Sequence, residues 1–287
     1  DVFRVGEEVL TATFEKFAPE GSVVTAAPYP VISYKQAMLE FGSDKPDLRN
    51  PLRIVDVTDF FQRCTFKPFH GQTVRAIKVS NKMSKGFQEK LLKFATSIGM
   101  GGLGYLEVKE DLSYKGPIDK FIPDDMKAEI REIAGLKGGD TIFFIADKEK
   151  QAALYAGQLR NELGQRLDLL EKNAYRFCFI NDFPMYEYDE EQKKIIFTHN
   201  PFSMPQGGLE ALTTKDPLEL LAYQYDIVCN GVELSSGAVR NHNLDIMVKA
   251  FEIAGYTEED LKEKFGALYN AFQYGAPPHA GMAPGVD

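Results

Sequence analysis

The 287-residue sequence contains no tryptophan, only three cysteines and only four histidines. Three widely separated cysteines argue against a disulfide framework or a zinc ribbon, and so few histidines offer little for a soft-metal site. No apolar run approaches the roughly 20 residues that cross a bilayer, and the first thirty residues lack the apolar stretch of a secretory signal. These absences predict a cytoplasmic protein that is not embedded in a membrane.

Charge is distributed unevenly along the chain. The formal net charge is −9, yet residues 63–93 contain a single acidic residue, Glu89, and eight basic ones (Arg63, Lys67, Arg75, Lys78, Lys82, Lys85, Lys90 and Lys93). Such a stretch can meet a polyanion even when the whole protein is acidic. On charge alone, a solvated helix and strand face explains the pattern better than a binding surface does.

Three stretches of the chain differ in pattern. Residues 1–50 predict an amphipathic helix at 2–17, with four apolar side chains on one stripe (Val2, Val5, Val9 and Phe17). After a polar segment, residues 51–163 alternate between strand and helix patterns and predict a compact α+β domain. Ser84 is expected to cap the first long helix of that domain.

Residues 164–287 form the third stretch, which begins with β patterns. Runs at 183–188 and 194–198 predict a hairpin, and a helix is expected around residues 218–222. Thr257 and Asp260 have the spacing of a capping box at the start of the last helix.

The richest chemical pattern lies at residues 225–239. Asn230-Gly231 between two β runs predicts a type I′ turn, because both central residues of that turn need positive φ. In this register Asp226 and Glu233 lie diagonally on one face of the sheet. Two carboxylates so placed can bind one hard cation, and Mg²⁺ that also takes substrate phosphates fits best. Two exposed acids on a hairpin are the alternative, which the apolar neighbours disfavour.

Two further residues beside this hairpin are candidates for ligand binding. Arg240 has the wrong parity to share the carboxylate face, unless a bulge within 235–237 re-aims it; its guanidinium would then suit a carboxylate or a phosphate. His199 ends a strand before Pro201 and can face a ligand, although such a histidine more often caps a turn.

Five motifs follow one another along the chain: GSDKPDLR at 42–49, DFPMYE at 182–187, HNPF at 199–202, NGVELSSGAVR at 230–240 and QYGAPPH at 273–279. With these motifs in this order, the chain resembles the bacterial type of aspartyl-tRNA synthetase over essentially its whole length, and residues 51–163 are similar to the GAD insertion domain of that family. The resemblance implies an α+β fold in which a partial class II antiparallel core, residues 1–50 and 164–287, is interrupted by the insertion.

The resemblance also implies a reaction and its partners. A family member joins L-aspartate to ATP as aspartyl-adenylate and transfers the aspartyl group to the 3′ end of tRNA(Asp); whether tRNA(Asn) is also charged stays open. The enzyme is expected to be a cytoplasmic homodimer that uses ATP and Mg²⁺. No side chain is expected to act as a catalytic acid, base or nucleophile.

Site residues follow from the same resemblance, motif by motif. Asp226 and Glu233 would hold Mg²⁺, and Glu233 would also bind ATP. His199 and Arg240 would bind aspartate. Further ATP contacts would come from Gly285, Val286 and Asp287. Candidate contacts with tRNA are Arg63, Lys67, Lys82, Lys85 and Lys90.

The chain departs from the family pattern in several places. Asn200 stands where many relatives have a second histidine, and Ser235-Ser236-Gly237 replaces a glycine triplet. The segments of the first two class II motifs and the anticodon-binding barrel are absent, and the chain ends one residue before the arginine expected to clamp ATP. We therefore expect the isolated chain not to activate aspartate.

Two other functions are compatible with the same residues. One is a non-catalytic tRNA-binding or scaffold module derived from the synthetase, and the other is a metabolic paralogue that makes a free amide. The set Asp226, Glu233, His199 and Arg240 favours the enzyme, because a scaffold has no need of it. The presence of the whole insertion block disfavours the paralogue.

Overall fold

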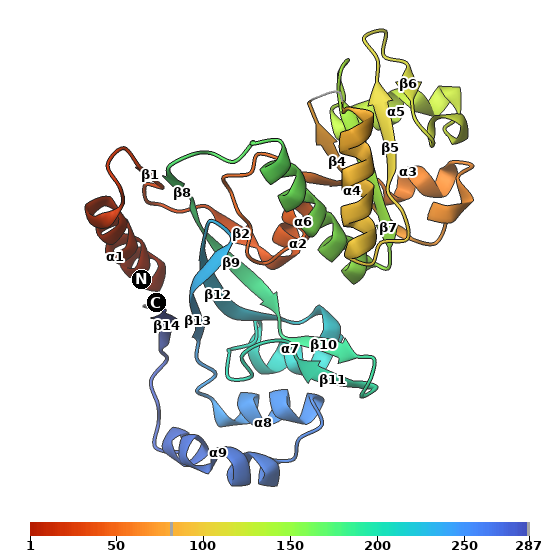
Figure 1. Cartoon of the computed structure of the whole chain (residues 1–287). Coiled ribbons are helices and arrows are strands. Elements are labelled where there is room, and N and C mark those ends of the chain that lie inside the picture. The colour runs from red at the N-terminus through yellow and green to blue at the C-terminus, as the bar shows by residue number, and fades with distance from the viewer. Residues whose placement is uncertain (81–82, 286–287) are drawn as a thin grey trace. The chain divides into compact units, whose positions relative to one another are not determined.

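A computed structural model describes residues 1–80 and 83–285 of the chain. The chain folds into two compact units (Figure 1): a split unit, formed by Asp1–Lys35 and Asn173–Asp287, and an inserted unit, Gln36–Lys172. The sequence placed the boundaries at 50/51 and 163/164, and both of these positions lie inside the inserted unit. None of the helices in the described ranges is long and apolar enough to cross a bilayer.

The split unit is built on a five-stranded sheet in the order β14-β13-β12-β9-β2 (Figure 1). Its neighbours are antiparallel except for the parallel pair β2 and β9. Expectation and structure agree on a mixed α+β fold with antiparallel sheets. The strands are β2 (Val31–Ser33), β9 (Phe177–Pro184), β12 (Leu221–Cys229), β13 (Val232–Val239) and β14 (Ala280–Pro284).

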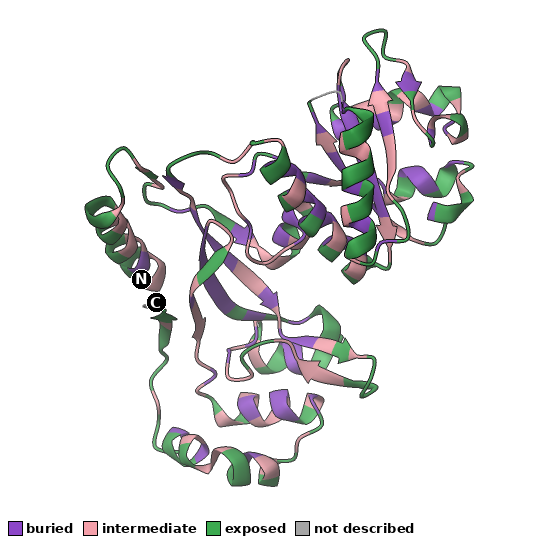
Figure 2. Ribbon diagram, viewed as in Figure 1, coloured by how far each residue is buried: buried purple, intermediate pink, exposed green. Residues whose placement is uncertain are grey.

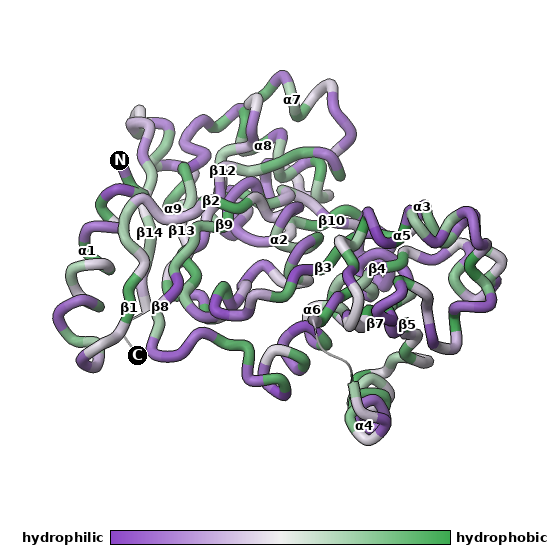
Figure 3. Tube along the Cα trace, turned by 90° about the horizontal axis from the view of Figure 1, so that it is seen from above, coloured by the Kyte–Doolittle hydropathy of each residue, from purple (hydrophilic) through white to green (hydrophobic). Residues whose placement is uncertain are grey.

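The first helix, α1 (Val2–Phe17), forms where the sequence predicts it but buries a different face. Apolar residues recur along this helix (Figure 3), and those packed on the core beside the sheet are Phe3, Leu10 and Phe14. Phe3 stacks on Phe179 with ring centres 4.0 Å apart, while Val5, Val9 and Phe17 are at least half exposed. The predicted stripe is therefore wrong, because aromatic contacts with the sheet outweigh the burial of valines.

Smaller elements complete the split unit. The predicted hairpin is confirmed as β10 and β11, and a capping box of Thr257 and Asp260 begins α9. The helix expected around 218–222 is wrong: a single 3-10 turn ends at Glu219, and Leu221 and Ala222 pair with β9 instead. These elements are β1 (Val23–Val24), β8 (Ala174–Tyr175), β10 (Tyr186–Asp189), β11 (Lys194–Phe197), α7 (Gly208–Thr214), α8 (Leu244–Ile253) and α9 (Glu258–Phe272).

The inserted unit has its own five-stranded antiparallel sheet in the order β3-β4-β7-β5-β6. Hydrophobic side chains pack on both faces, so the strands of this sheet are largely buried (Figure 2). This double burial explains why residues 141–145 are apolar almost without interruption. The strands are β3 (Ile54–Asp56), β4 (Thr73–Val79), β5 (Gly104–Val108), β6 (Tyr114–Lys115) and β7 (Thr141–Asp147).

Helices cover both faces of this second sheet. Side chains of α4 and α6 join the core on one face, and those of α3 and α5 join the core on the other. Ser84 caps α4 as predicted, since its hydroxyl accepts a hydrogen bond from the Phe87 N–H at 3.2 Å. These four helices are α3 (Thr58–Arg63), α4 (Lys85–Ser97), α5 (Lys127–Ala134) and α6 (Glu149–Arg166), and α2 (Tyr34–Phe41) begins at the end of the first segment of the split unit.

Buried hydrogen bonds to α6 explain why residues before position 51 belong to the inserted unit. Asn50 donates from Nδ2 to the Arg160 carbonyl at 2.9 Å. The Arg160 guanidinium, 1% exposed, donates to the carbonyls of Asp47, Asn50 and Leu52. Burial lowers the pKa of Arg160 to about 10, so the side chain stays charged at neutral pH and anchors this segment.

Candidate functional site

The hairpin that joins β12 to β13 forms in the predicted register. Asn230 and Gly231 have φ of 53° and 85°, and Val228 pairs with Glu233. The Asn230 side chain also ties the turn to β8 and the residue after it: Oδ1 accepts from the Arg176 N–H and Nδ2 donates to the Ala174 carbonyl, both at 2.9 Å. The local turn signal therefore fixes the position of both carboxylates.

A bulge in this hairpin brings Arg240 onto the carboxylate face. Between the pairs Val228–Glu233 and Ile227–Ser235, one extra residue, Leu234, is inserted. Side-chain parity on β13 shifts by one after Leu234. Arg240 consequently has the same parity as Glu233, and the bulge required by the sequence argument is present just before the expected segment 235–237.

Asp226 and Glu233 share this face but differ in environment. Asp226 is 4% exposed, whereas Glu233 is open to solvent. Within residues 1–80 and 83–285, no group of three or more His, Cys, Asp or Glu side chains is arranged to hold a metal ion. One buried and one exposed carboxylate suit Mg²⁺, which usually completes its shell with water and substrate phosphates.

A groove of about 320 Å³ adjoins this face, which we call the Arg240 groove. It is lined by Asn200, Ser236, Arg240 and His279, and by residues 280–283 of β14. No acidic side chain of the described residues lines it. The Arg240 N–H donates to the His279 carbonyl at 2.9 Å, so the strand end is held in place. The groove therefore offers a cation and polar side chains to an anionic ligand.

Glycine is required in the wall of this groove at position 237. A Cβ there would lie 2.4 Å from both the Gly281 carbonyl oxygen and the Tyr225 ring. Such contacts are far shorter than real side chains show, so only glycine permits β14 to approach β13. This is the close-approach position of the segment 235–237.

His199 and Asn200 reach different surroundings. The His199 ring packs edge-on against Phe183, with centres 4.9 Å apart, and it is not among the residues that line the groove. Asn200 does line it. The Asn200 Oδ1 accepts from the Phe202 N–H at 2.9 Å, and its Nδ2 is the donor of the same amide.

The sequence patterns do not predict Asn200, Ser236 or His279 as site residues. The His279 Nδ1 donates to the Pro277 carbonyl at 2.8 Å. This bond to a carbonyl two residues earlier orients the His279 ring. That Pro-Pro-His signal was available in the sequence. The role of Asn200 needed the tertiary position of the loop that follows β11.

The predicted ATP-binding tail is described only in part. Gly285 is exposed, and its N–H donates to the Leu234 carbonyl at 2.8 Å, which extends the contact of β14 with β13. Val286 and Asp287 lie outside the described residues. Gly285 is not among the residues that line the Arg240 groove.

The basic stretch at 63–93 does not form one continuous surface. Arg75 is 6% exposed and forms an ion pair with Asp56. Lys78 donates to the Gly135 carbonyl at 2.8 Å, at the end of α5. These two side chains therefore bind other groups of the inserted unit.

The five tRNA-contact candidates also differ among themselves. Arg63 is exposed but forms a two-point ion pair with Glu129. Lys82 lies outside the described residues. Lys67, Lys85 and Lys90 are exposed, and these three stay predictions for RNA contact.

The chain matches a known protein family over its whole length. The family "tRNA synthetases class II (D, K and N)" matches residues 1–287, and the chain belongs to this family. Relatives named aspartate–tRNA(Asp/Asn) ligase include those of Gluconobacter oxydans, 55% identical over 294 residues, and Zymomonas mobilis, 53% identical over 294 residues.

The alignments include only part of each relative. Each alignment includes 100% of this chain and 49% of the relative, so the chain spans about half the length of the curated relatives it matches. Among solved structures, the aspartyl tRNA synthetase of Entamoeba histolytica aligns with 75% of this chain and 38% of its own at 16% identity, with a TM-score of 0.28.

Proposed function

We propose that this chain is part of an aspartate–tRNA ligase. The reaction activates L-aspartate with ATP to aspartyl-adenylate and then transfers the aspartyl group to the 3′ end of tRNA(Asp). Relatives carry both tRNA(Asp) and tRNA(Asn) in their names, which supports tRNA(Asn) as a second acceptor. The observation that carries the proposal is the common face of Asp226, Glu233 and Arg240 beside a groove without acidic side chains.

Arg240 is proposed to bind the aspartate carboxylate. A guanidinium offers two parallel N–H groups to a carboxylate, a geometry that lysine cannot reproduce. The backbone bond to His279 and the Phe202 ring, 5.8 Å from the guanidinium carbon, limit where this side chain can point. His199 is proposed as a second aspartate contact, with its ring orientation supported by Phe183.

Asp226 and Glu233 are proposed to hold Mg²⁺ together with ATP, and Gly285, Val286 and Asp287 to lie along ATP. When bound, the ion would neutralise charge on the phosphates. In-line attack of a carboxylate on the α-phosphate depends on positioning and charge neutralisation rather than on a protein base. This agrees with a site in which no side chain is assigned as a catalytic acid, base or nucleophile.

The test is aspartate-dependent ATP–pyrophosphate exchange by the full-length gene product that contains this chain. Arg240→Lys should raise KM for aspartate by at least about tenfold, since one charge-assisted hydrogen bond contributes about 1.5–3 kcal/mol. Glu233→Gln should lower exchange and raise the Mg²⁺ concentration needed for half-maximal rate. Arg4→Lys and Glu263→Gln, on exposed helical positions, are matched controls.

Unchanged exchange in both Arg240→Lys and Glu233→Gln would contradict the site assignment. Exchange that depends on another amino acid would contradict the substrate. Exchange absent from the wild type, with RNA still bound, would favour the non-catalytic tRNA-binding module. We further propose that the protein is cytoplasmic and forms a homodimer. Light scattering of the purified gene product would test the homodimer.

A further inference from the structure

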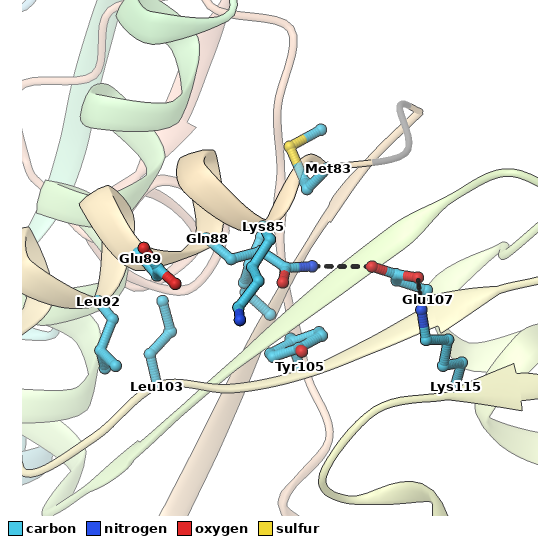
Figure 4. A pocket seen from close by; sticks show the side chains of 10 residues that line it. Met83, Lys85, Gln88, Glu89, Leu92, Leu103, Tyr105, Glu107 and Lys115 are labelled. Atoms are coloured by element: carbon cyan, nitrogen blue, oxygen red, sulfur yellow. Dashed lines mark hydrogen bonds and ion pairs between the residues drawn. The ribbon is translucent and has the colours of Figure 1, made fainter.

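A pocket of about 420 Å³ lies in the inserted unit between α4 and β5 (Figure 4). Side chains reach it from α4 (Lys85, Gln88, Glu89 and Leu92), from β5 (Tyr105 and Glu107) and from β6 (Lys115), and Met83, Leu103 and Phe143 complete the lining. Its volume is within the range of small-molecule sites. The pocket is unrelated to the proposed aspartate and ATP contacts.

One part of the pocket is apolar. Leu92 is 45% exposed, although its neighbour Leu91 is buried in the core. Tyr105 is half-buried, and its ring centre lies 6.4 Å from that of Phe143. A leucine and a supported aromatic ring beside an opening suit a flat ring that stacks.

Three polar side chains of the pocket, Gln88, Glu107 and Lys115, are joined to one another. Gln88 Nε2 donates to Glu107 Oε1 at 2.8 Å, and Lys115 Nζ lies 3.7 Å from Glu107 Oε2 (Figure 4). Because the Gln88 amide donates to Glu107, its Oε1 is the atom left to accept. Lys115 supplies donors at the other end of the Glu107 carboxylate. A ligand with donors and acceptors along one edge matches this arrangement, and nucleobases have such edges.

The pocket is lined by two lysines and two glutamates, and further lysines lie along α4. Lys85, Lys90 and Lys93 are exposed, and none forms an ion pair with a residue of the described ranges. Glu89 is the single acidic residue of this helix. A phosphate backbone that passes over α4 would therefore meet a net positive helix.

We infer that this pocket receives one unstacked nucleobase of a single-stranded RNA segment. The base stacks on Tyr105 beside Leu92, its edge meets Gln88 and Lys115, and an adjacent phosphate lies on Lys85. The inference deepens the proposed function, on which it rests for the RNA partner, because it names a single-stranded segment as what the inserted unit binds. Duplex RNA does not offer a base in this way.

The test is the affinity of the 287-residue chain for a fluorescent single-stranded RNA octamer of mixed sequence, measured by anisotropy at several salt concentrations. Tyr105→Leu should weaken binding by about fivefold to a hundredfold, because base–aromatic stacking contributes about 1–3 kcal/mol. Tyr105→Phe keeps the ring and should bind as the wild type does. Leu92→Glu, at an exposed position, should weaken binding without entering the core.

The phosphate contact has its own measurement. Lys85→Gln should lower the slope of log Kd against log salt by about 0.7, the value for one phosphate of a single strand. Lys109→Gln, an exposed lysine of the same unit outside the pocket, should leave the slope unchanged. If the slope falls equally in both variants, Lys85 contributes only as a general surface charge, and the proposed contact between Lys85 and one phosphate is wrong.

Several outcomes would overturn the inference. If Tyr105→Leu and Leu92→Glu bind the octamer with wild-type affinity, the pocket is not the binding site of the base. Equal affinity for duplex RNA would exclude an unstacked base, and displacement of the octamer by an equal concentration of cytidine or adenosine 5′-monophosphate would indicate a site for free nucleotides. Aspartate-dependent exchange needs no RNA, so failure of the proposed enzyme and failure of this pocket are observed separately.

Discussion

The backbones of Gly42 and Gly157 cross so closely that neither can carry a side chain. A Cβ on Gly157 would lie 2.5 Å from the Gly42 carbonyl oxygen, and one on Gly42 would lie 2.5 Å from the Gly157 nitrogen. Gly42 also has φ of 65°. This crossing lets the segment after α2 pack against α6, and it holds the motif 42–49 in the inserted unit.

Gly157→Ala should therefore destabilise the inserted unit. Separating two backbones that are in contact opens the packing around them, and we expect a loss of about 2–4 kcal/mol in the free energy of unfolding. Urea denaturation followed by circular dichroism measures this loss. Gly86→Ala, on an exposed turn of α4 with no atom within 4 Å of the added Cβ, should change stability by less than about 1 kcal/mol, mostly toward greater stability. Equal effects of the two variants would contradict the crossing.

Asn230→Ala should destabilise the split unit more than Asn230→Gly does. Both variants lose the bonds to the Arg176 N–H and the Ala174 carbonyl, but only alanine is strained at φ of 53°. We expect a difference of about 1 kcal/mol between the two variants and a total loss of about 2–3 kcal/mol for alanine. Urea midpoints of the two proteins give the comparison, and alanine equal to glycine would contradict a type I′ turn.

Acid should weaken the inserted unit through Asp56. Burial acts to raise its pKa, but hydrogen bonds from Thr58 and the charge of Arg75 outweigh it, so the pKa lies below 3.8. A lowered carboxyl pKa gives stability above about pH 4 that is lost as pH falls through the folded-state pKa. Asp56→Asn should thus be less stable than the wild type at pH 7, with a difference that shrinks below pH 4. Asp125→Asn, at an exposed position, is the control; a constant difference for Asp56→Asn down to pH 2.5 would contradict the linkage.

Native thiols should not react at mildly alkaline pH. Burial raises the pKa of Cys178 to about 12 and that of Cys64 to about 11, so both stay protonated at pH 8, where the thiolate is the reactive form. All three cysteines are buried, and none is in a disulfide. A thiol reagent at pH 8 should label none within minutes in the native chain and all three in 8 M urea. Fast labelling of Cys64 in the native chain would indicate local opening near α3.

Features set by neighbouring residues could be predicted, whereas those set by distant ones could not. The turn at Asn230-Gly231, the cap at Ser84 and the capping box at Thr257 depend on a few adjacent residues. The buried face of α1 depends on Phe179, more than 160 positions away, and the burial of Arg75 depends on sheet pairing in the inserted unit.

Some residues of the candidate site could likewise be predicted from local sequence, and others could not. Asp226 and Glu233 come from one hairpin, so their common face follows from the turn. Asn200 enters the groove because its loop returns to the end of β13, where Ser203 pairs with Arg240. No local spacing signals that return. The aspartate contact expected of His199 stays a prediction for the same reason.

The bulge at Leu234 makes chain length in this hairpin as constrained as residue identity. Glu233 and Arg240 are separated by an odd number of positions, and they share a face only because one residue is added between them. Removing that residue would turn Ser236, Ala238 and Arg240 to the opposite side of the sheet while Asp226 and Glu233 stayed in place. A one-residue deletion would therefore separate the guanidinium from the carboxylates without altering any of the three side chains.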